Sequence, residues 1–343
     1  MSYRVEVQPS GRAFSVEAGE SVLAAALRQG VLLPYNCRSG TCGSCRGHLI
    51  AGEVRYPEGE PPGISTEGRA AGEALLCQAE PRGDLVIRVR EVDAVADIPV
   101  RTLPCRVVHL DRLADDVVRL SLKLPDTERL QFLAGQYVEF LLADGRRRPF
   151  SLANPPHDDR FLELHIRHVS GGSFTDYVFS QLKERTLFRI RGPLGTFFLR
   201  EDTGRPAILM AGGTGFAPVK AMIEHGLHRR STREFHVYWG ARSRSGLYLD
   251  ELARGWSQAH ENVRYVPVLS DPEPGDGWGG RTGPVHEAVL ADFPELYGLE
   301  VYASGPPAMV YAGRDAFLAR GLPEDQMFSD AFEFMRDRPA APA

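Results

Sequence analysis

The stretch Cys37-Arg38-Ser39-Gly40-Thr41-Cys42-Gly43-Ser44-Cys45 places three cysteines on one short segment, and Cys77 follows after 31 further residues. Three thiolates on a loop plus a distant fourth is the ligand spacing of a [2Fe–2S] cluster. The residues between the cysteines are small, as a loop requires when its backbone N–H groups close on the sulfides of a cluster. We therefore predict Cys37, Cys42, Cys45 and Cys77 as the metal ligands.

A zinc site and a disulfide pair are the alternatives for these cysteines. Zinc sites usually show two C-x2–4-C pairs or histidine partners, whereas this chain has one short pair and a lone fourth cysteine. The spacing therefore favours iron and sulfide. The fifth cysteine, in the run Cys105-Arg106-Val107-Val108, is expected to be a buried strand residue.

Composition limits the classes of protein that fit. A chain of 343 residues with 43% hydrophobic and 25% charged residues is typical of a globular protein with two or three domains. A net charge of −5 and the absence of a basic run give no reason to expect a nucleic-acid partner. The N-terminus shows no secretory signal pattern, and no apolar stretch approaches a membrane span. Because thiolate ligands need reducing conditions, we expect a cytoplasmic protein.

The chain divides into three predicted domains, at residues 1–95, 101–203 and 204–343. In the first, the expected elements are two strands over Tyr3–Val7 and Ala13–Val16, a helix over Val22–Gln29, a loop over Pro57–Gly72 and a last strand over Asp84–Val89. The second shows many short strands, including Cys105–Leu110, Val117–Leu122, Tyr137–Leu141 and Leu162–Val169, which favours an antiparallel barrel. In the third, strands such as Ala207–Met210 alternate with helices such as Pro218–His228, which favours a parallel α/β domain.

Two motifs in the second segment suit a flavin dinucleotide. In Arg148-Pro149-Phe150-Ser151, the guanidinium would pair with pyrophosphate, the phenyl ring would pack by the isoalloxazine, and the hydroxyl would reach its polar edge near N5. About twenty residues later, Gly171-Gly172-Ser173-Phe174-Thr175 leads into an expected helix start at Thr175, where N–H groups can bind phosphate. A plain turn is the alternative for the glycine-rich stretch.

The third segment contains a glycine turn that leaves a strand and enters a helix, Gly212-Gly213-Thr214-Gly215-Phe216-Ala217-Pro218. Such a turn lets the backbone approach pyrophosphate at a helix N-terminus.

Together these motifs resemble a known family. The first segment resembles plant-type ferredoxins, which implies a β-grasp fold, and the second resembles the FAD domain of ferredoxin–NADP⁺ reductase-like flavoproteins. The strand Leu164-His165-Ile166-Arg167 matches the strand that lines the flavin in that family, and Gly212–Pro218 matches its Gly-Gly-Thr-Gly-x-x-Pro nicotinamide motif. The segment Ser304-Gly305-Pro306-Pro307 matches the family's Cys-Gly-Pro-Pro segment at the nicotinamide pocket. Ser304 stands where many members have cysteine, and it can still donate a hydrogen bond beside the nicotinamide ring. The resemblance also implies an aromatic near the C-terminus that shields the flavin, Phe332 or, second, Phe334.

The resemblance covers nearly the whole chain and is to single-chain NAD(P)H reductases, among them oxygenase reductase components and CDP-6-deoxy-Δ3,4-glucoseen reductases. It implies that FAD splits the hydride pair from NADH into single electrons for the cluster, which passes them to a separate dehydrase or oxygenase protein. Ser304-Gly305-Pro306-Pro307 and Phe328–Phe332 look closer to the glucoseen reductase branch. Ser151, Ser304 and Phe332 are the candidate catalytic residues.

The preferred nucleotide is expected to be NADH. Gly240 and Arg242 end the strand beside the adenosine ribose, where a basic residue can accommodate the 2′-phosphate of NADPH. The Gly240-Ala241-Arg242 turn nevertheless resembles NADH-using ferredoxin-fused reductases. We expect a monomer. The rival interpretation, an electron carrier or redox sensor without turnover, gives no reason for a nicotinamide motif.

Overall fold

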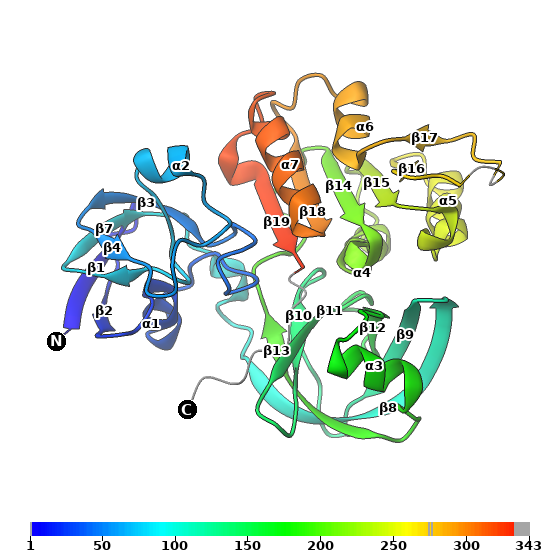
Figure 1. Cartoon of the computed structure of the whole chain (residues 1–343), viewed down its shortest axis with the longest axis horizontal. Helices are drawn as coiled ribbons and strands as arrows, with labels where there is room; N and C mark the ends of the chain where they lie inside the picture. The colour runs from blue at the N-terminus through cyan, green and yellow to red at the C-terminus, as the bar shows by residue number, and fades with distance from the viewer. Residues whose placement is uncertain (1, 274, 276, 333–343) are drawn as a thin grey trace. The chain divides into compact units, whose positions relative to one another are not determined.

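The structure, a computed structural model, describes residues 2–273, 275 and 277–332, which fall into two compact units (Figure 1). The described part of the first unit comprises residues 2–98, 195–197 and 329–332, and that of the second comprises residues 99–194, 198–273, 275 and 277–328. The second unit therefore contains most of both the predicted barrel domain and the predicted nucleotide domain. The boundaries near residues 95–101 and 203–204 stay predictions.

The first unit is built on a five-stranded sheet with the order β2-β1-β7-β3-β5. Its strands are β1 (Ser2–Gln8), β2 (Ala13–Glu17), β3 (Arg46–Ala51), β5 (Glu73–Leu75) and β7 (Leu85–Arg88), and β1 pairs with β7 in parallel. Helix α1 (Val22–Arg28) begins where the Ser21 side chain accepts a hydrogen bond from the N–H of Ala24 at 3.2 Å. A two-stranded sheet of β4 (Val54–Arg55) and β6 (Glu80–Pro81) and a 3-10 turn, η1 (Asp93–Val95), complete it. This is the expected β-grasp arrangement, although a short helix α2 (Thr66–Ala70) interrupts the predicted loop.

The barrel of the second unit is a six-stranded antiparallel sheet with the order β11-β10-β13-β8-β9-β12. The strands are β8 (Arg101–Ala114), β9 (Val117–Lys123), β10 (Tyr137–Leu141), β11 (Arg147–Ser151), β12 (Leu162–Arg167) and β13 (Leu187–Leu194), with α3 (Ser173–Ser180) between the last two. An antiparallel bridge between Leu152 and Leu164 joins the two end strands and closes the sheet. Inward-facing apolar residues fill the barrel, and Cys105 is among them at 2% exposure. The predicted antiparallel barrel and the buried cysteine are confirmed.

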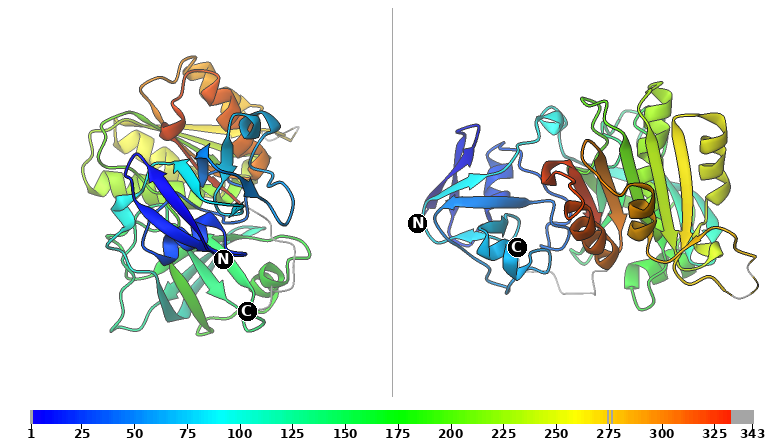
Figure 2. Two further views of the ribbon diagram at one scale, coloured as in Figure 1. Left: turned by 90° about the vertical axis from the view of Figure 1, so that its left-hand side faces the viewer. Right: turned by 90° about the horizontal axis from the view of Figure 1, so that it is seen from above.

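The rest of the second unit contains five strands in the order β17-β16-β15-β14-β18, which pair in parallel. They are β14 (Ala207–Gly212), β15 (Phe235–Ala241), β16 (Val263–Leu269), β17 (Arg281–Thr282) and β18 (Glu300–Gly305). A last strand, β19 (Met327–Ala331), follows β18 in the sheet order, and its residues from Ser329 onward belong to the first unit. Helices α4 (Phe216–His228), α5 (Asp250–Ala259), α6 (Val285–Asp292) and α7 (Pro307–Leu318) pack against the parallel strands (Figure 2). Short 3-10 turns η2 (Gly213–Gly215), η3 (Arg244–Gly246) and η4 (Glu324–Gln326) complete the elements. The predicted parallel α/β domain is confirmed.

The strand order places both predicted nucleotide motifs at one point. The chain runs outward from β14 to β15 and β16, then returns to place β18 on the other side of β14. Ligands of open α/β sheets bind where the strand order reverses, outside the carboxyl ends of the strands. The glycine turn follows β14 and the Ser304-Gly305 segment ends β18, so both motifs lie at this reversal.

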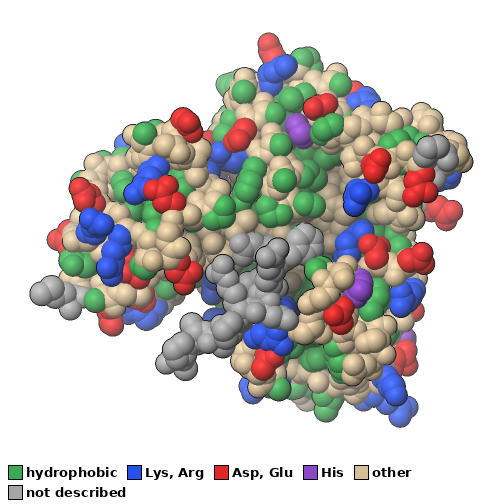
Figure 3. Space-filling view, in the orientation of Figure 1, with side chains coloured by type: hydrophobic (Ala, Val, Ile, Leu, Met, Phe, Trp, Pro, Cys, Tyr) green, Lys and Arg blue, Asp and Glu red, His purple; other side chains and the backbone are tan. Residues whose placement is uncertain are grey.

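The molecular surface carries mixed charge on the face drawn in Figure 3, where basic and acidic side chains are interspersed. Among the described residues, no helix is both long enough and apolar enough to cross a membrane.

Candidate functional site

The four predicted cluster ligands lie in the first unit. Cys37, Cys42 and Cys45 lie on the loop between α1 and β3, and Cys77 follows β5. Cys42 and Cys45 are 2% exposed and Cys77 is 7% exposed, while Cys37 is half-buried. All five cysteines, Cys105 included, are free thiols. The disulfide alternative is therefore wrong.

The cysteine sulfurs associate in two pairs. A hydrogen bond with Cys42 lowers the pKa of Cys37 to about 5, and the same contact, together with burial, raises the pKa of Cys42 well above its usual value. A hydrogen bond with Cys77 and burial raise the pKa of Cys45 in the same way. The backbone N–H of Cys42 donates to the Sγ of Cys37 at 3.2 Å. Two pairs of sulfurs, with an N–H group directed at one of them, form a donor set that fits a [2Fe–2S] cluster.

Glycine at position 40 permits the path of this loop. Gly40 has a φ of +80°, and a Cβ there would lie 2.5 Å from the Cβ of Pro61. Its carbonyl accepts a hydrogen bond from the N–H of Gly63 at 2.9 Å. Any larger residue would therefore be strained in conformation and would also displace the segment that covers the loop.

Two short segments distant in sequence also belong to the first unit and contact the loop. The hydroxyl of Ser44, between two ligand cysteines, donates to the carbonyl of Ser329 at 2.6 Å. The N–H of Tyr35 donates to the hydroxyl of Thr196 at 2.9 Å. These partners are 285 and 161 residues apart in the chain, so no local pattern could have predicted them.

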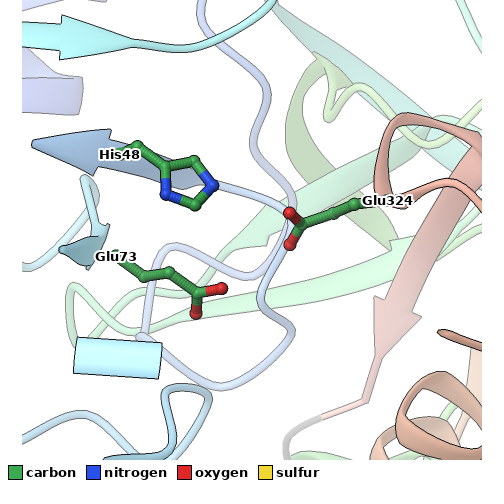
Figure 4. A group of neighbouring side chains, drawn as sticks. All are labelled: His48, Glu73 and Glu324. Atoms are coloured by element: carbon green, nitrogen blue, oxygen red, sulfur yellow. The ribbon is translucent and has the colours of Figure 1, made fainter. Parts of the chain in front are cut away.

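The first unit also has a histidine, His48, close to a glutamate, Glu73, and these side chains are candidate metal ligands. His48 on β3 is the register partner of Glu73 on β5 (Figure 4). The carboxylate of Glu73 pairs with the guanidinium of Arg46, and Glu324, the third residue labelled in Figure 4, belongs to the second unit. Since the carboxylate of Glu73 already has a cationic partner, we assign no ion to these groups.

The first predicted flavin motif forms the strand β11. Its residues are Arg148, Pro149, Phe150 and Ser151. Phe150 is half-buried and packs against the rings of Phe140 and Phe174 in the barrel core, with ring centroids 5.7 Å away in both cases. Ser151 is 8% exposed, and Pro149 is exposed on the same face of the strand. The motif is therefore a regular strand whose aromatic partly fills the core.

The second predicted flavin motif is the turn before α3. The helix begins at Ser173 with Gly172 as its N-cap, two residues earlier than the predicted start at Thr175, which is wrong. The hydroxyl of Thr175 lies 3.0 Å from the carbonyls of Val169 and Gly172 and accepts from the N–H of Val169 at 3.1 Å. Since this hydroxyl closes the turn, it is not available to an anion, whereas the backbone N–H groups of the first helical residues can bind one.

Strand β12 carries the three remaining flavin predictions. Ile166 is fully buried in the barrel core, whereas His165 and Arg167 lie on the opposite face of the strand. Arg167 pairs with Asp116, and its guanidinium lies 3.7 Å from the position that a Cβ on Gly213 would occupy. This face of the barrel is therefore directed at the glycine turn after β14.

The glycine turn has the predicted strand–turn–helix form. Gly213, Thr214 and Gly215 form the 3-10 turn η2 between β14 and α4, and Pro218 is buried in the first turn of α4. Gly213 has a φ of +54°, and its carbonyl accepts a hydrogen bond from the indole N–H of Trp239 at 3.0 Å.

The two nucleotide motifs make close backbone contact. A Cβ on Gly215 would lie 2.1 Å from the carbonyl oxygen of Ser304, and one on Gly305 would lie 2.8 Å from the carbonyl oxygen of Gly212. Ser304 is fully buried, and its hydroxyl has no hydrogen-bond partner among the described residues. Pro306, which follows, is exposed. The strand ends thus form a backbone cradle with one free buried donor, which fits a nicotinamide nucleotide.

The predicted ribose residues lie at the end of β15. Gly240 packs against Val285, where a Cβ would come within 2.9 Å of the valine side chain. The side chain of Arg242 is 87% exposed, and its guanidinium lies 3.8 Å from the carboxylate of Asp271.

Of the C-terminal aromatics, Phe332 is described and is half-buried in the first unit. Phe334 lies outside the described residues. The flavin-shielding role of either residue stays a prediction.

The folds and the two sites together define a reductase that moves electrons between a nucleotide, a flavin and an iron–sulfur cluster. Three family models match in chain order: the 2Fe-2S iron-sulfur cluster binding domain over residues 5–82, the oxidoreductase FAD-binding domain over 104–199 and the oxidoreductase NAD-binding domain over 209–315. The chain belongs to the family of single-chain iron–sulfur flavoprotein reductases that join these three domains.

Individual relatives cover nearly its whole length. The chain is 41% identical to the CDP-6-deoxy-L-threo-D-glycero-4-hexulose-3-dehydrase reductase of Yersinia pestis, with 97% of this chain and 99% of the relative covered. It is 38% identical to the phenol 2-monooxygenase reductase component DmpP of a Pseudomonas species, over 97% and 95% of the two chains. Among solved structures, the cytochrome P450 reductase GcoB of Amycolatopsis is similar at a TM-score of 0.74 and 37% identity, over 96% and 98% of the chains.

These similarities confirm the predicted cofactors, [2Fe–2S], FAD and NAD(P)H, and the predicted enzyme class, an NAD(P)H-dependent oxidoreductase. The non-catalytic carrier interpretation is wrong, because the relatives are reductases with a nucleotide-binding domain.

Proposed function

We propose that the chain passes electrons from NADH through FAD and the cluster to a separate dehydrase that acts on a deoxysugar nucleotide. The main support for a nucleotide site is the backbone contact between the Gly212–Gly215 turn and the Ser304-Gly305 segment. This contact lies directly beside β12 of the flavin barrel. The acceptor is proposed from the relative at 41% identity, which is named as a dehydrase reductase.

Each site residue then has a physical role. The hydroxyl of Ser304, buried and without a partner among the described residues, would donate to the nicotinamide, and Gly215 and Gly305 allow the close backbone contact between the two motifs that places this hydroxyl beside the glycine turn. Arg148 would bind pyrophosphate and Ser151 would face the flavin ring. When bound, FAD accepts a hydride and releases single electrons, which the cluster held by Cys37, Cys42, Cys45 and Cys77 passes on.

The exposed position of Arg242 supports NADH, rather than NADPH, as the preferred nucleotide. A 2′-phosphate at its guanidinium would also meet the carboxylate of Asp271, 3.8 Å away, so the arginine offers little net attraction for a dianion. Steady-state kinetics with both nucleotides test this proposal, and NADH should show the higher kcat/KM. A clear preference for NADPH would contradict it. We also propose that the protein is cytoplasmic and monomeric. Sedimentation of the purified protein tests the oligomeric state.

The acceptor is tested by following NADH consumption with candidate partners, anaerobically for a dehydrase and in aerated buffer, where O2 is the oxidant, for an oxygenase component. We expect NADH consumption to increase on addition of a purified CDP-6-deoxy-L-threo-D-glycero-4-hexulose 3-dehydrase and its substrate, and to stay at the aerobic basal rate with an oxygenase component and its substrate. The reverse result supports the second candidate, an oxygenase reductase, for which the 38% identity to a phenol 2-monooxygenase component is the supporting observation.

The order of carriers is tested by the Cys42→Ser variant. It should lose iron and acid-labile sulfide but keep NADH-dependent reduction of ferricyanide, which takes electrons directly from flavin. Loss of flavin reduction in this variant would contradict the proposed route.

A further inference from the structure

One face of β12 connects the flavin barrel to the nucleotide domain. Leu162, Leu164 and Ile166 fill the barrel core, so the alternating Glu163, His165 and Arg167 lie on the opposite face. This face therefore carries a carboxylate, an imidazole and a guanidinium in succession. Charged groups are rarely buried unless they have a partner, so each of these side chains should have one. The partners of the first two are on the nucleotide domain.

Lys220 is the partner of the carboxylate. It is 7% exposed and lies in the second turn of α4, the helix that begins directly after the Gly213–Gly215 turn. Its ammonium group donates to Glu163 at 3.3 Å, to Glu224 at 2.9 Å and to the carbonyl of Ala153 at 3.2 Å. The three ammonium donors meet three acceptors, two of them on the flavin barrel.

Tyr248 is the partner of the imidazole. Its hydroxyl lies 3.0 Å from the Nδ1 of His165, whose Nε2 lies 2.8 Å from the carboxylate of Glu163. Burial lowers the pKa of His165 despite that carboxylate, so we assign the neutral imidazole, with Nε2–H donating to Glu163 and Nδ1 accepting from the tyrosine. Burial works against the charged form of Glu163, but His165 and Lys220 outweigh it and lower the pKa of Glu163 to about 2.

Both contacts lead to the same glycine turn. Lys220 is five residues beyond Gly215 on the helix that the turn starts. The ring of Tyr248 packs edge-on against Trp239 at 5.0 Å, and the indole N–H of Trp239 donates to the carbonyl of Gly213 at 3.0 Å. The turn is therefore connected to β12 through two sets of contacts, one through Lys220 and one through Tyr248, which meet at the hydrogen bond between Glu163 and His165.

We propose that Glu163, His165, Lys220 and Tyr248 form an interdomain clamp that fixes the nucleotide turn against the flavin barrel, which makes Lys220 and Tyr248 positioning residues for hydride transfer. The inference rests on the proposed flavin and nicotinamide sites. Hydride transfer requires the reacting atoms to lie about 3–3.5 Å apart, and a misplacement of 1 Å costs about a hundredfold in rate. The contacts of Lys220 and those of Tyr248 each hold the turn in that position, and neither residue contacts substrate.

The test uses the full-length holoprotein with Tyr248→Phe and Lys220→Met. Tyr238→Phe is the control for the first, because it removes a hydroxyl bonded to Asp292 at 2.5 Å, away from the barrel. Lys123→Met is the control for the second, because Lys123 pairs with exposed Asp126. Anaerobic stopped-flow bleaching of the flavin gives the limiting reduction rate per bound FAD, and hydrogen exchange reports the mobility of residues 213–228.

For Lys220→Met we expect the limiting rate to fall about tenfold, less than a full 1 Å displacement would produce, and for Tyr248→Phe a smaller loss. Exchange at residues 213–228 should become faster in both, while the dissociation constant of ADP-ribose stays within about twofold, because that ligand does not depend on the flavin barrel. Both controls should match the parent. Unchanged rates and exchange in both variants would overturn the clamp. If the parent protein itself fails to reduce its flavin with NADH, the proposed function fails rather than the clamp.

Discussion

The backbone contact between the two nucleotide motifs can be tested by one added methyl group, in Gly215→Ala. A Cβ at this position would lie 2.1 Å from the carbonyl oxygen of Ser304 and 2.8 Å from the backbone nitrogen of Gly305. Ordinary carbon–oxygen contacts are about 3.3 Å or longer, so one strand end must retreat by about 1.2 Å. Gly215 has a φ of −58° and a ψ of −12°, which alanine adopts freely, so the expected effect is purely steric.

The magnitude follows from the rigidity of the neighbours. Overpacking of a well-packed interior costs about 1–3 kcal/mol, and the contacted atoms here are backbone atoms at the end of a sheet strand. We expect Gly215→Ala to lose about that much free energy of unfolding, and to lower the rate of flavin reduction by NADH about a hundredfold, since the displacement is about 1 Å. Urea unfolding and anaerobic stopped-flow absorbance measure the two effects.

Gly255→Ala is the matched control. Gly255 lies inside α5, and a Cβ there meets no atom within 4 Å, so alanine should stabilise the helix by about 0.5–1 kcal/mol and leave flavin reduction unchanged. If Gly215→Ala is as stable and as active as Gly255→Ala, the two motifs do not approach each other as described, and the nucleotide site has been placed wrongly.

Three further outcomes are expected. Glu300→Gln should cost about 3–5 kcal/mol in urea unfolding, because it leaves the buried guanidinium of Arg233 without its charged partner, whereas removal of the half-exposed carboxylate of Asp111 should cost less than about 1 kcal/mol. Burial lowers the pKa of His165 below the usual 6.5, so as pH falls the unfolded chain binds a proton there before the folded protein does. The free energy of unfolding should therefore decrease as pH falls from about 6.5, and it should decrease less steeply in His165→Gln. Cys105, whose pKa burial raises to about 12, should resist iodoacetamide at pH 8 in the native protein, since about one thiol in ten thousand is ionised; rapid modification would contradict this.

The predictions that the sequence supported best depended on local spacing. The cysteine intervals, the alternation in Tyr137–Leu141 and the glycines of the turn after β14 are each set within a few residues. Such patterns report how the backbone must bend and which side of a strand is buried. The structure accordingly contains the predicted barrel, parallel sheet and cysteine loop.

The errors and omissions have a different physical origin. The predicted start of α3 at Thr175 is two residues late, because the helix begins at Ser173 and the hydroxyl of Thr175 closes the preceding turn. The partners of the β12 face, Lys220 and Tyr248, are 57 and 83 residues from Glu163 and His165, and only tertiary folding brings them together. One local signal was available, the alternation of Glu163, His165 and Arg167 with apolar residues, which indicates a strand face with polar partners.

The polar character of the clamp is itself informative. Buried ion pairs seldom stabilise a protein more than well-packed apolar residues of similar volume, so stability alone does not explain the ammonium of Lys220 between Glu163 and Glu224. An apolar contact tolerates sliding, whereas three hydrogen bonds from one ammonium group define a single position. We therefore expect the triple variant Lys220→Met, Glu163→Leu, Glu224→Leu to be more stable than Lys220→Met, which leaves both carboxylates without a cationic partner. The triple variant should retain only the cost of the unpaired His165 Nε2–H and Ala153 carbonyl, about 1–3 kcal/mol each, but should lose the limiting rate of flavin reduction as Lys220→Met does. A triple variant that retains both stability and rate would show that these charges do not determine the position of the nucleotide turn.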